Sequence, residues 1–200
     1  MQLADLPQPT TPAALAARAV SRHFQPAALA NHCERSYLFA AALGEQAGLA
    51  YDAELLYVAA MLHDLGLAEP FDAHTVAFEQ AGGSVAWVFA AGAGWPADRC
   101  ERASEIIVRH MWPSVDPELD VEGYLLESAT SLDIGGVRPE LWPAGLRAEV
   151  VAAHPHLDLA TEFGRCFTDQ AARKPESRAA AAVRNGIVER LAANRLGLPD

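Results

Sequence analysis

Residues 59–66 have the sequence AAMLHDLG and constrain the fold most, because they place a histidine and an aspartate at the end of an apolar helical run. His63 follows Ala59 by four residues and Leu56 by seven, which puts it on the stripe that such a helix buries. Gly66 can adopt the left-handed conformation that closes a helix. The pair has two interpretations: a hydrogen-bonded core histidine beside a capping aspartate, or two ligands of one metal ion at the last helical turn.

The composition favours an all-α protein with one core. Of the 200 residues, 51% are apolar, and the β-branched residues form no sustained alternating run. A chain of this length can bury a full core around a polar site. The sequence shows no internal repeat, low-complexity linker or break in composition that would mark a second domain, so we expect a single-domain helical bundle.

Charge and cysteine content narrow the classes of function. The net charge of -11 argues against nucleic acid as a partner, since phosphate backbones require clustered lysines and arginines. Cys33, Cys100 and Cys166 are far apart and odd in number, so we expect reduced thiols in a cytoplasmic protein. The N-terminus lacks the features of a signal peptide, and the apolar run at 85–94 is too short to span a bilayer, so we expect no membrane partner.

The predicted helices divide the chain into three regions of one domain. Residues 1–25 form a proline-rich arm and a short helix over 12–24, with Thr11 as its N-cap. Residues 26–140 form the core region, and residues 141–200 add C-terminal helices. A loop at 68–75 covers the end of the helix that carries His63. The helices predicted after residue 25 cover 26–48, 52–64, a segment starting near Phe78, 96–110, 118–134, 138–153, 157–171 and 175–196.

Four of these helices bring polar side chains to an apolar face, where a lone charge is costly to bury. Each such side chain stands three or four residues after an apolar neighbour, such as Leu29, Ile106 or Ala129. Imidazoles and carboxylates gathered in a core are stable when a cation neutralises them. The side chains that could gather in this way are His32, His63, Asp64, His110 and Asp133.

The order of these residues resembles the HD superfamily of metal-dependent hydrolases over about residues 25–140. The likeness to its cyanamide hydratase branch is carried by NHCERSYLF at 31–39, LHDLG at 62–66, FE at 78–79 and IIVRH at 106–110. The resemblance implies a bundle of the HD type with a buried metal site. It also implies one divalent ion, zinc foremost and iron or manganese as alternatives, bound by His32, His63, Asp64 and Asp133.

Three further residues are candidates for catalysis. His110 is a ligand of a second metal, a proton donor to the substrate, or a core histidine. Glu79 either orients a ligating imidazole or is a first-turn acid favoured by the helix dipole. His74 is a substrate contact or a surface residue. Many HD nucleotidases carry a glutamate a few residues after the His-Asp pair, and here the first glutamate is Glu69, just before a proline.

Three residues near these motifs receive no role from the sequence. Arg35 adjoins the ligand candidates in sequence, but we expect its side chain to point elsewhere around the helix. His154 and His156 lie beyond the region of likeness and are not assigned.

The resemblance implies a hydratase or hydrolase, classed as a lyase when it hydrates cyanamide, that adds metal-activated water to a small nitrile-like molecule. One lysine and the lack of a glycine-rich phosphate loop support this choice. The same-class alternative is a phosphohydrolase of nucleotide monophosphates or other small phosphoesters, which would need an arginine such as Arg18 or Arg22 turned into the pocket. A different-class alternative is a non-catalytic helical interaction module. Exposed alanine-rich helix faces are compatible with a homodimer.

Overall fold

The computed structural model describes residues 1–194 and residue 196, which form ten α-helices and three short 3-10 helices without a strand. The all-α prediction is confirmed. Residue 195 and residues 197–200, which end the predicted C-terminal region, lie outside the described residues. The 3-10 helices are Leu3–Asp5, Leu65–Leu67 and Pro139–Leu141. The α-helices are α1 (Pro12–Phe24), α2 (Ala27–Ala47), α3 (Ala53–Leu62), α4 (Phe78–Gly92), α5 (Ala97–Arg109), α6 (Val121–Gly135), α7 (Ala144–Ala153), α8 (Leu159–Arg173), α9 (Arg178–Arg184) and α10 (Ile187–Ala193).

Side-chain caps explain where several helices begin. The side chains of Thr11, Asp52, Asp120 and Ser177 each accept a hydrogen bond from the backbone N–H three residues later. Each cap of this kind contributes about 1 kcal/mol. At the other end of α6, Gly136 adopts the left-handed conformation with φ of 62° and closes the helix. The starts of α1 and α3 and the end of α6 therefore follow the sequence prediction.

The role predicted for Gly66 is wrong. The helix α3 ends at Leu62, and Gly66 lies inside the following 3-10 helix without a left-handed φ. A Cβ atom at Gly66 would stand 2.0 Å from the carbonyl oxygen of Phe78 at the start of α4. Glycine is needed there because two backbone segments approach each other closely, which holds the His63-Asp64 turn against α4.

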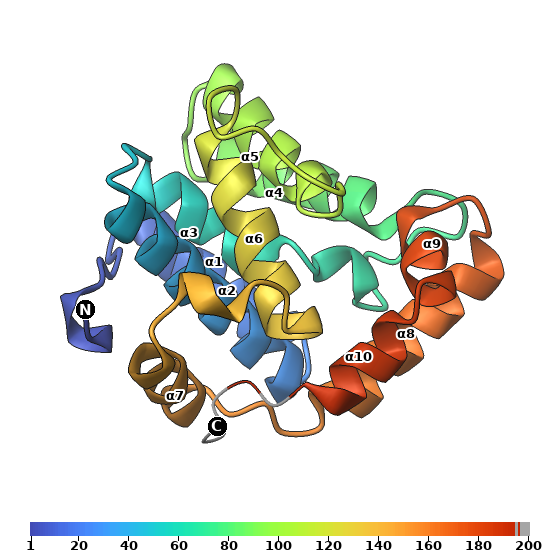
Figure 1. The fold of residues 1–200 in the computed structure, drawn as a ribbon. Helices are drawn as coiled ribbons and strands as arrows, with labels where there is room; N and C mark the ends of the chain where they lie inside the picture. Colours follow the sequence, from blue (N-terminus) through green and yellow to red (C-terminus); the bar gives the residue numbers. More distant parts are fainter. Residues whose placement is uncertain (195, 197–200) are drawn as a thin grey trace.

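The C-terminal helices also differ from the prediction. The segment predicted as one helix over 138–153 begins with the 3-10 helix, and α7 starts only at Ala144. The segment predicted as one helix over 175–196 is split into α9 and α10 at Gly186, which has φ of 75°. Because the chain turns there, α10 packs back against α8 (Figure 1).

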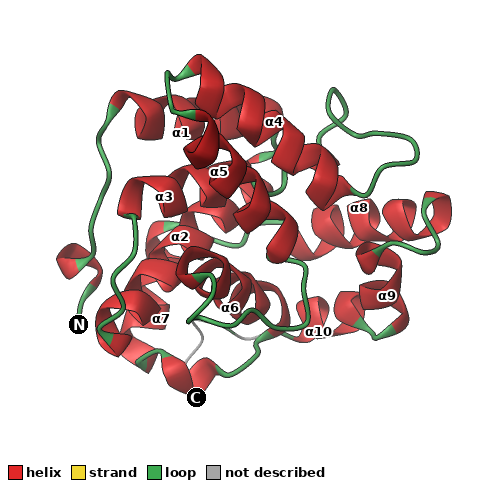
Figure 2. Cartoon of the chain, turned by 90° about the horizontal axis from the view of Figure 1, so that it is seen from above, coloured by secondary structure: helices red, strands yellow, loops and turns green. Residues whose placement is uncertain are grey.

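The central helix of the bundle is α2, which packs against α3, α6 and α8. Its residues 32–44 are all buried. The helix α1 covers α3 on one side, and the antiparallel pair α4 and α5 covers α3 on another (Figures 1 and 2). The middle of α2 and the end of α3 therefore meet in the interior, where their polar residues are removed from water.

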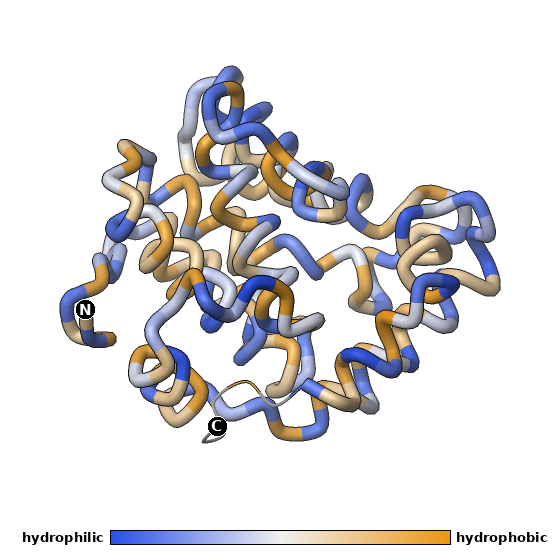
Figure 3. The backbone as a smooth tube through the Cα atoms, viewed as in Figure 1, coloured by the Kyte–Doolittle hydropathy of each residue, from blue (hydrophilic) through white to orange (hydrophobic). Residues whose placement is uncertain are grey.

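A second, smaller hydrophobic cluster joins α8, α9 and α10 to the bundle. Leu29 of α2 and Ile134 of α6 belong to this cluster, together with Phe163 and Phe167 of α8. Hydrophilic and hydrophobic residues alternate along these helices, as expected when one face is exposed (Figure 3). We call residues 159–193 the C-terminal arm. Among the described residues, no helix is long and apolar enough to cross a membrane.

Candidate metal centre

Three buried side chains from α2 and from the turn after α3 point at one another. The Nε2 atoms of His32 and His63 are 3.2 Å apart, and Oδ2 of Asp64 lies 3.6 Å from the first and 3.4 Å from the second. Ligands of a tetrahedral ion with bonds of about 2.1 Å stand about 3.4 Å apart. The three atoms therefore have the spacing of a metal-binding group.

The hydrogen bonds of the two rings leave both Nε2 atoms facing this group. Nδ1 of His32 donates to Oδ2 of Asp133 at 2.7 Å, and Nδ1 of His63 donates to the carbonyl oxygen of Ala60 at 2.7 Å. A neutral ring with its proton on Nδ1 presents a lone pair at Nε2. Oδ2 of Asp64 is buried and has no hydrogen-bond partner among the described residues. Three atoms with lone pairs thus lie close together without a hydrogen-bond donor between them. A cation bound among them would neutralise their mutual repulsion.

The ionisation of the carboxyls adds negative charge to this part of the core. Burial raises the pKa of the Asp64 carboxyl, but the imidazoles of His63 and His32 outweigh burial and lower the pKa below its ordinary value. Burial also raises the pKa of Asp133, but the Arg35 guanidinium holds it well below its usual range. Asp64 in turn raises the pKa of His63 well above 6.5 in spite of burial. The site therefore attracts a cation, and a metal ion there competes with a proton.

Asp133 lies outside the three-residue metal group, and it contacts that group through its hydrogen bond with His32. Its two oxygens accept from Nε and Nη2 of Arg35, each at 2.7 Å, and one of them also accepts from His32. Nη1 of Arg35 donates to the backbone carbonyls of His154 and Pro155. This network fixes the ring of His32. Ligation of the ion by Asp133 stays a prediction.

The expectation that Arg35 points elsewhere is wrong. Arg35 follows His32 by three residues, and side chains three apart lie on one face of a helix. Its side chain is fully buried and forms a two-bond ion pair with Asp133. The segment after α7, which the sequence left unassigned, takes part through its carbonyls, and Nε2 of His156 lies 3.5 Å from Oδ1 of Asp133.

His110 lies beside the metal group without belonging to it. The centroids of its ring and that of His63 are 4.9 Å apart, and its Nδ1 donates to the carbonyl oxygen of Ile107. Burial, followed by the neighbouring His63, lowers the pKa of His110 to about 3. The ring is therefore neutral near pH 7 and can accept a hydrogen bond at Nε2. The roles considered for His110 stay predictions.

The structure does not bring Glu79 or His74 to the metal pocket. Glu79 is buried near the start of α4, its Oε2 has no hydrogen-bond partner among the described residues, and burial raises its pKa. His74 is exposed in the loop before α4 and lines a different cavity together with Asp72 and Arg173. Catalytic roles for these two residues stay predictions.

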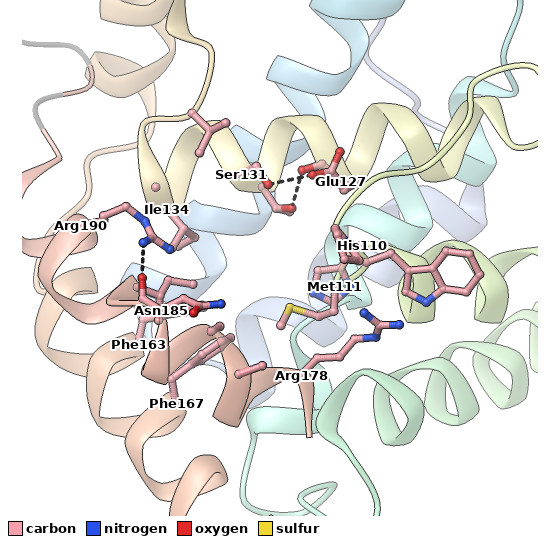
Figure 4. A pocket seen from close by; sticks show the side chains of 18 of the residues that line it. His110, Met111, Glu127, Ser131, Ile134, Phe163, Phe167, Arg178, Asn185 and Arg190 are labelled. Atoms are coloured by element: carbon pink, nitrogen blue, oxygen red, sulfur yellow. Dashed lines mark hydrogen bonds between the residues drawn. The ribbon is translucent and has the colours of Figure 1, made fainter. Parts of the chain in front are cut away.

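A cavity of about 330 Å³ opens from the metal group (Figure 4). Met111, Phe163 and Phe167 supply apolar walls, while α6 supplies Glu127 and Ser131. The C-terminal arm adds Arg178, Asn185 and Arg190 along the exposed side. The complete lining is His32, His63, Asp64, His110, Met111, Trp112, Pro113, Glu127, Thr130, Ser131, Ile134, Gly135, Val137, Phe163, Phe167, Arg178, Ala181, Ala182, Asn185, Ile187 and Arg190.

Sequence reasoning missed the polar residues of this pocket. It followed the stripe of α6 that contains Ala129 and Asp133, whereas Glu127, Ser131 and Ile134 lie on the neighbouring stripe at spacings of four and three. That spacing was a usable signal. The contribution of the C-terminal arm carried no comparable signal, because it depends on where the chain turns after α7.

The arginines considered for phosphate binding are engaged elsewhere. Nε of Arg18 lies 2.5 Å from Oε1 of Glu34, and Nη2 of Arg22 lies 3.4 Å from the same oxygen. Neither arginine lines the pocket. Arg178 and Arg190 do line it, and neither forms an ion pair with a described residue.

Comparison with known protein families finds a match to part of the chain. Residues 29–127 match the family model of the HD domain. This stretch contains all three residues of the metal group and ends before Asp133. No curated protein matches the chain significantly. An HD domain typically carries metal-dependent hydrolase activity, and together with the buried group of two histidines and an aspartate it indicates a divalent metal site.

Proposed function

We propose, from the premise of an HD domain at residues 29–127, that the protein is a metal-dependent hydratase or hydrolase. The reaction is the addition of metal-activated water to a small nitrile-like molecule, of the type that converts cyanamide to urea. One observation carries the proposal: three electron-rich atoms of His32, His63 and Asp64 converge without a donor where the cavity meets the core.

In this proposal the ion is held by His32, His63 and Asp64. Two imidazole nitrogens and one carboxylate oxygen suit zinc foremost, with iron or manganese as alternatives. A divalent ion bound there would supply Lewis acidity for the activation of water. Three protein ligands leave room in the coordination shell for water and substrate, and the neutral ring of His110 lines the same cavity and can accept a hydrogen bond.

Asp133 acts through His32. By accepting the Nδ1 proton it fixes the tautomer that presents Nε2 to the ion, and Arg35 holds the carboxylate in place. Direct ligation by Asp133 is the alternative, and it would require the carboxylate to release His32 and turn away from Arg35. Orientation of a ligand by Glu79 and substrate contact by His74 have less support, because neither residue lines the cavity.

The cavity supports a small substrate with little charge. Its inner walls are largely apolar, and its inner polar groups are the uncharged Thr130 and Ser131 and the carboxyl of Glu127. Arg18 and Arg22, the arginines expected to serve a phosphoester, are paired with Glu34 away from the cavity. A neutral molecule of the nitrile type fits this lining better than an anion does.

A second candidate function is hydrolysis of nucleotide monophosphates or other small phosphoesters. The observation that favours it is the pair Arg178 and Arg190, which line the exposed side of the cavity and form no ion pair within the described part of the chain. Guanidinium groups bind phosphate in two-bond geometry. A phosphate in this cavity would share it with the carboxyl of Glu127, which disfavours an anion there.

We further propose a cytoplasmic setting with a small-molecule substrate as the partner and without a nucleic-acid or membrane partner. The net charge of -11 supports the first of these exclusions. The alanine-rich outer faces of several helices allow a homodimer.

The experiment is metal analysis by plasma mass spectrometry on protein purified without an affinity tag, followed by a cyanamide-to-urea assay on the same sample. We expect about one zinc or iron ion per chain and production of urea, because the ligand set has one ion-sized centre. A parallel assay follows phosphate release from a panel of nucleotide monophosphates.

Two other outcomes of these assays would each favour one of the alternative functions. Metal without urea but with phosphate release would favour the phosphohydrolase. Folded protein that contains no metal, and takes up none from added zinc, iron or manganese, would favour a non-catalytic helical interaction module.

A further inference from the structure

Glu127 is the one carboxylate outside the metal group among the described residues that line the cavity. It lies on α6, opposite Phe163 and Phe167 of the C-terminal arm (Figure 4). The residue is 6% exposed, so its carboxyl is largely removed from water. Burial raises its pKa above the ordinary value. A carboxyl in such a place is costly to bury unless its oxygens are bonded.

The protein satisfies only part of the bonding capacity of this carboxyl. Oε1 accepts from the Ser131 hydroxyl at 2.9 Å, and Oε2 accepts from the Ser128 hydroxyl at 3.4 Å. The nearest guanidinium, that of Arg138, is 3.7 Å away, which is too far for a hydrogen bond. An ionised carboxylate has about four lone-pair positions, so acceptor capacity is left on the side of the cavity.

We propose that Glu127 binds the substrate by accepting a hydrogen bond from an N–H group, so that the cavity selects small neutral molecules with an NH2 group of the amide or cyanamide type. This inference rests on the proposed function for the choice of the cavity as the substrate site. Glu127 is a substrate-binding residue in it, and the metal group is unchanged by it.

Two features of the cavity favour an N–H group over an anion next to Glu127. A phosphate or carboxylate there would place two negative charges together in a region of low dielectric constant, which is strongly unfavourable. The opposing walls, Phe163 and Phe167, offer no polar group that would compete for the N–H. Arg190 lies with Asn185 on one side of the cavity, and Arg178 lies on another side near Met111 (Figure 4).

The test compares two probes of nearly equal shape, acetamide, which has N–H groups, and acetone, which has none. Both carry methyl groups, so saturation-transfer NMR gives dissociation constants with the 200-residue chain as purified. We expect acetamide to bind wild type about tenfold or more tightly than acetone, because a hydrogen bond to a charged acceptor contributes about that factor.

Three variants test whether the preference for acetamide over acetone depends on Glu127. Glu127→Leu removes the acceptor and should bring the two dissociation constants within about twofold of each other. Glu127→Gln keeps an uncharged acceptor and should give an intermediate preference, which keeps the test valid should the leucine variant fold poorly. Glu122→Gln is the matched control, since Glu122 is also buried on α6 but bonds to the backbone N–H of Asp52 outside the cavity. It should retain the preference of wild type.

The inference is overturned when acetamide fails to bind, when both probes bind wild type equally, or when the preference survives both changes at Glu127. It is also overturned by an equal loss in Glu122→Gln. Urea assays on the same samples separate the two claims. A Glu127-dependent preference without urea production would retain this inference and reject the hydratase, whereas urea production without such a preference would do the reverse.

Discussion

The two halves of the pocket are built in different ways. On the metal side, His32, His63 and Asp64 are at most 1% exposed, and each ring is fixed by a hydrogen bond from its second nitrogen. On the other side, the C-terminal arm contributes exposed residues such as Arg178 and Arg190, and α10 buries only Leu191. One half is rigidly preorganised, and the other is held by a small hydrophobic cluster.

This difference separates the metal-binding half of the pocket from the half through which a substrate can enter. The HD match at 29–127 covers the metal group and stops before the arm. A preorganised group suits the binding of an ion, because its ligands need fixed positions within a fraction of an ångström. A wall with few buried contacts opens at lower free energy than the core does, and it suits the admission of a substrate.

The largest effect should come from breaking the metal side. His63→Ala removes a ligand whose Nε2 lies within 3.4 Å of the other two ligand atoms. Since even residues that only orient a ligand change affinity by about 10-fold to 100-fold, we expect a loss of more than about 100-fold in metal affinity and activity. Plasma mass spectrometry and the urea assay measure the two quantities. His23→Ala, at an exposed position on α1, is the control. Metal retained at the wild-type level in His63→Ala would place the ion elsewhere.

The next effect should come from the network behind the ligands. Arg35→Met leaves the Asp133 carboxylate buried without its cation, which costs about 3 to 5 kcal/mol. For a domain of this size the melting temperature should fall by about 6 to 20 °C. Thermal denaturation followed by circular dichroism measures it. Arg22→Met removes an exposed guanidinium that pairs with Glu34 at 3.4 Å, and it should change the free energy of unfolding by less than about 1 kcal/mol. Equal melting temperatures for the two variants would contradict a structural role for the buried pair.

The burial of His32 and His63 could be predicted from the sequence because both obey helical spacing, whereas the set of metal ligands came from the resemblance to the HD superfamily. His63 lies on a stripe set by Ala59 and Leu56, and the structure buries all three. Arg35 obeys the same rule, since it follows His32 by three residues, and the wrong expectation came from judging it by adjacency in sequence.

The arm could not be predicted in this way. Its helices were recognisable as amphipathic, but which cavity their apolar faces would line depends on the turn at Gly186 and on packing against Ile134. Gly66 shows the same limit, because its role is set by the carbonyl of Phe78, which comes from another helix. Such contacts between distant segments leave no periodic pattern in the chain.

A smaller effect should follow from changing the arm. Arg178→Ala removes an exposed side chain whose guanidinium lies 5.8 Å from the centroid of the Trp112 ring and has no carboxylate partner in the described part of the chain. For a neutral substrate we expect KM to change by no more than about twofold and metal content to stay the same, as exposed substitutions change free energies by about 0.5 kcal/mol. Steady-state kinetics with cyanamide measure KM. Arg184→Ala, on the same helix but outside the cavity, is the control. A rise of tenfold or more in KM for Arg178→Ala alone would assign recognition to the arm.

The smallest effect concerns how the arm is held. Asp72, in the loop before α4, accepts hydrogen bonds from Gln170 at 2.8 Å and Lys174 at 3.1 Å, and it pairs with Arg173. Burial raises the pKa of Asp72, but these bonds lower it below its ordinary value. A carboxyl with a lowered pKa in the folded state stabilises the protein above its unfolded pKa of about 4, and this stabilisation is lost as the pH falls through the lower folded value.

Asp72→Asn should therefore speed amide hydrogen exchange in α8 severalfold at neutral pH and leave exchange in the middle of α2 unchanged. In wild type the same local loosening should appear only as the pH falls below about 4. Hydrogen exchange read by mass spectrometry on peptides from the two helices measures both effects. Asp169→Asn is the control, since the one ion pair of Asp169 within the described residues is with Arg173 of its own helix. Equal acceleration in α2 and α8 would mean that the arm and the metal side open together, and the two halves of the pocket would then form one cooperative unit.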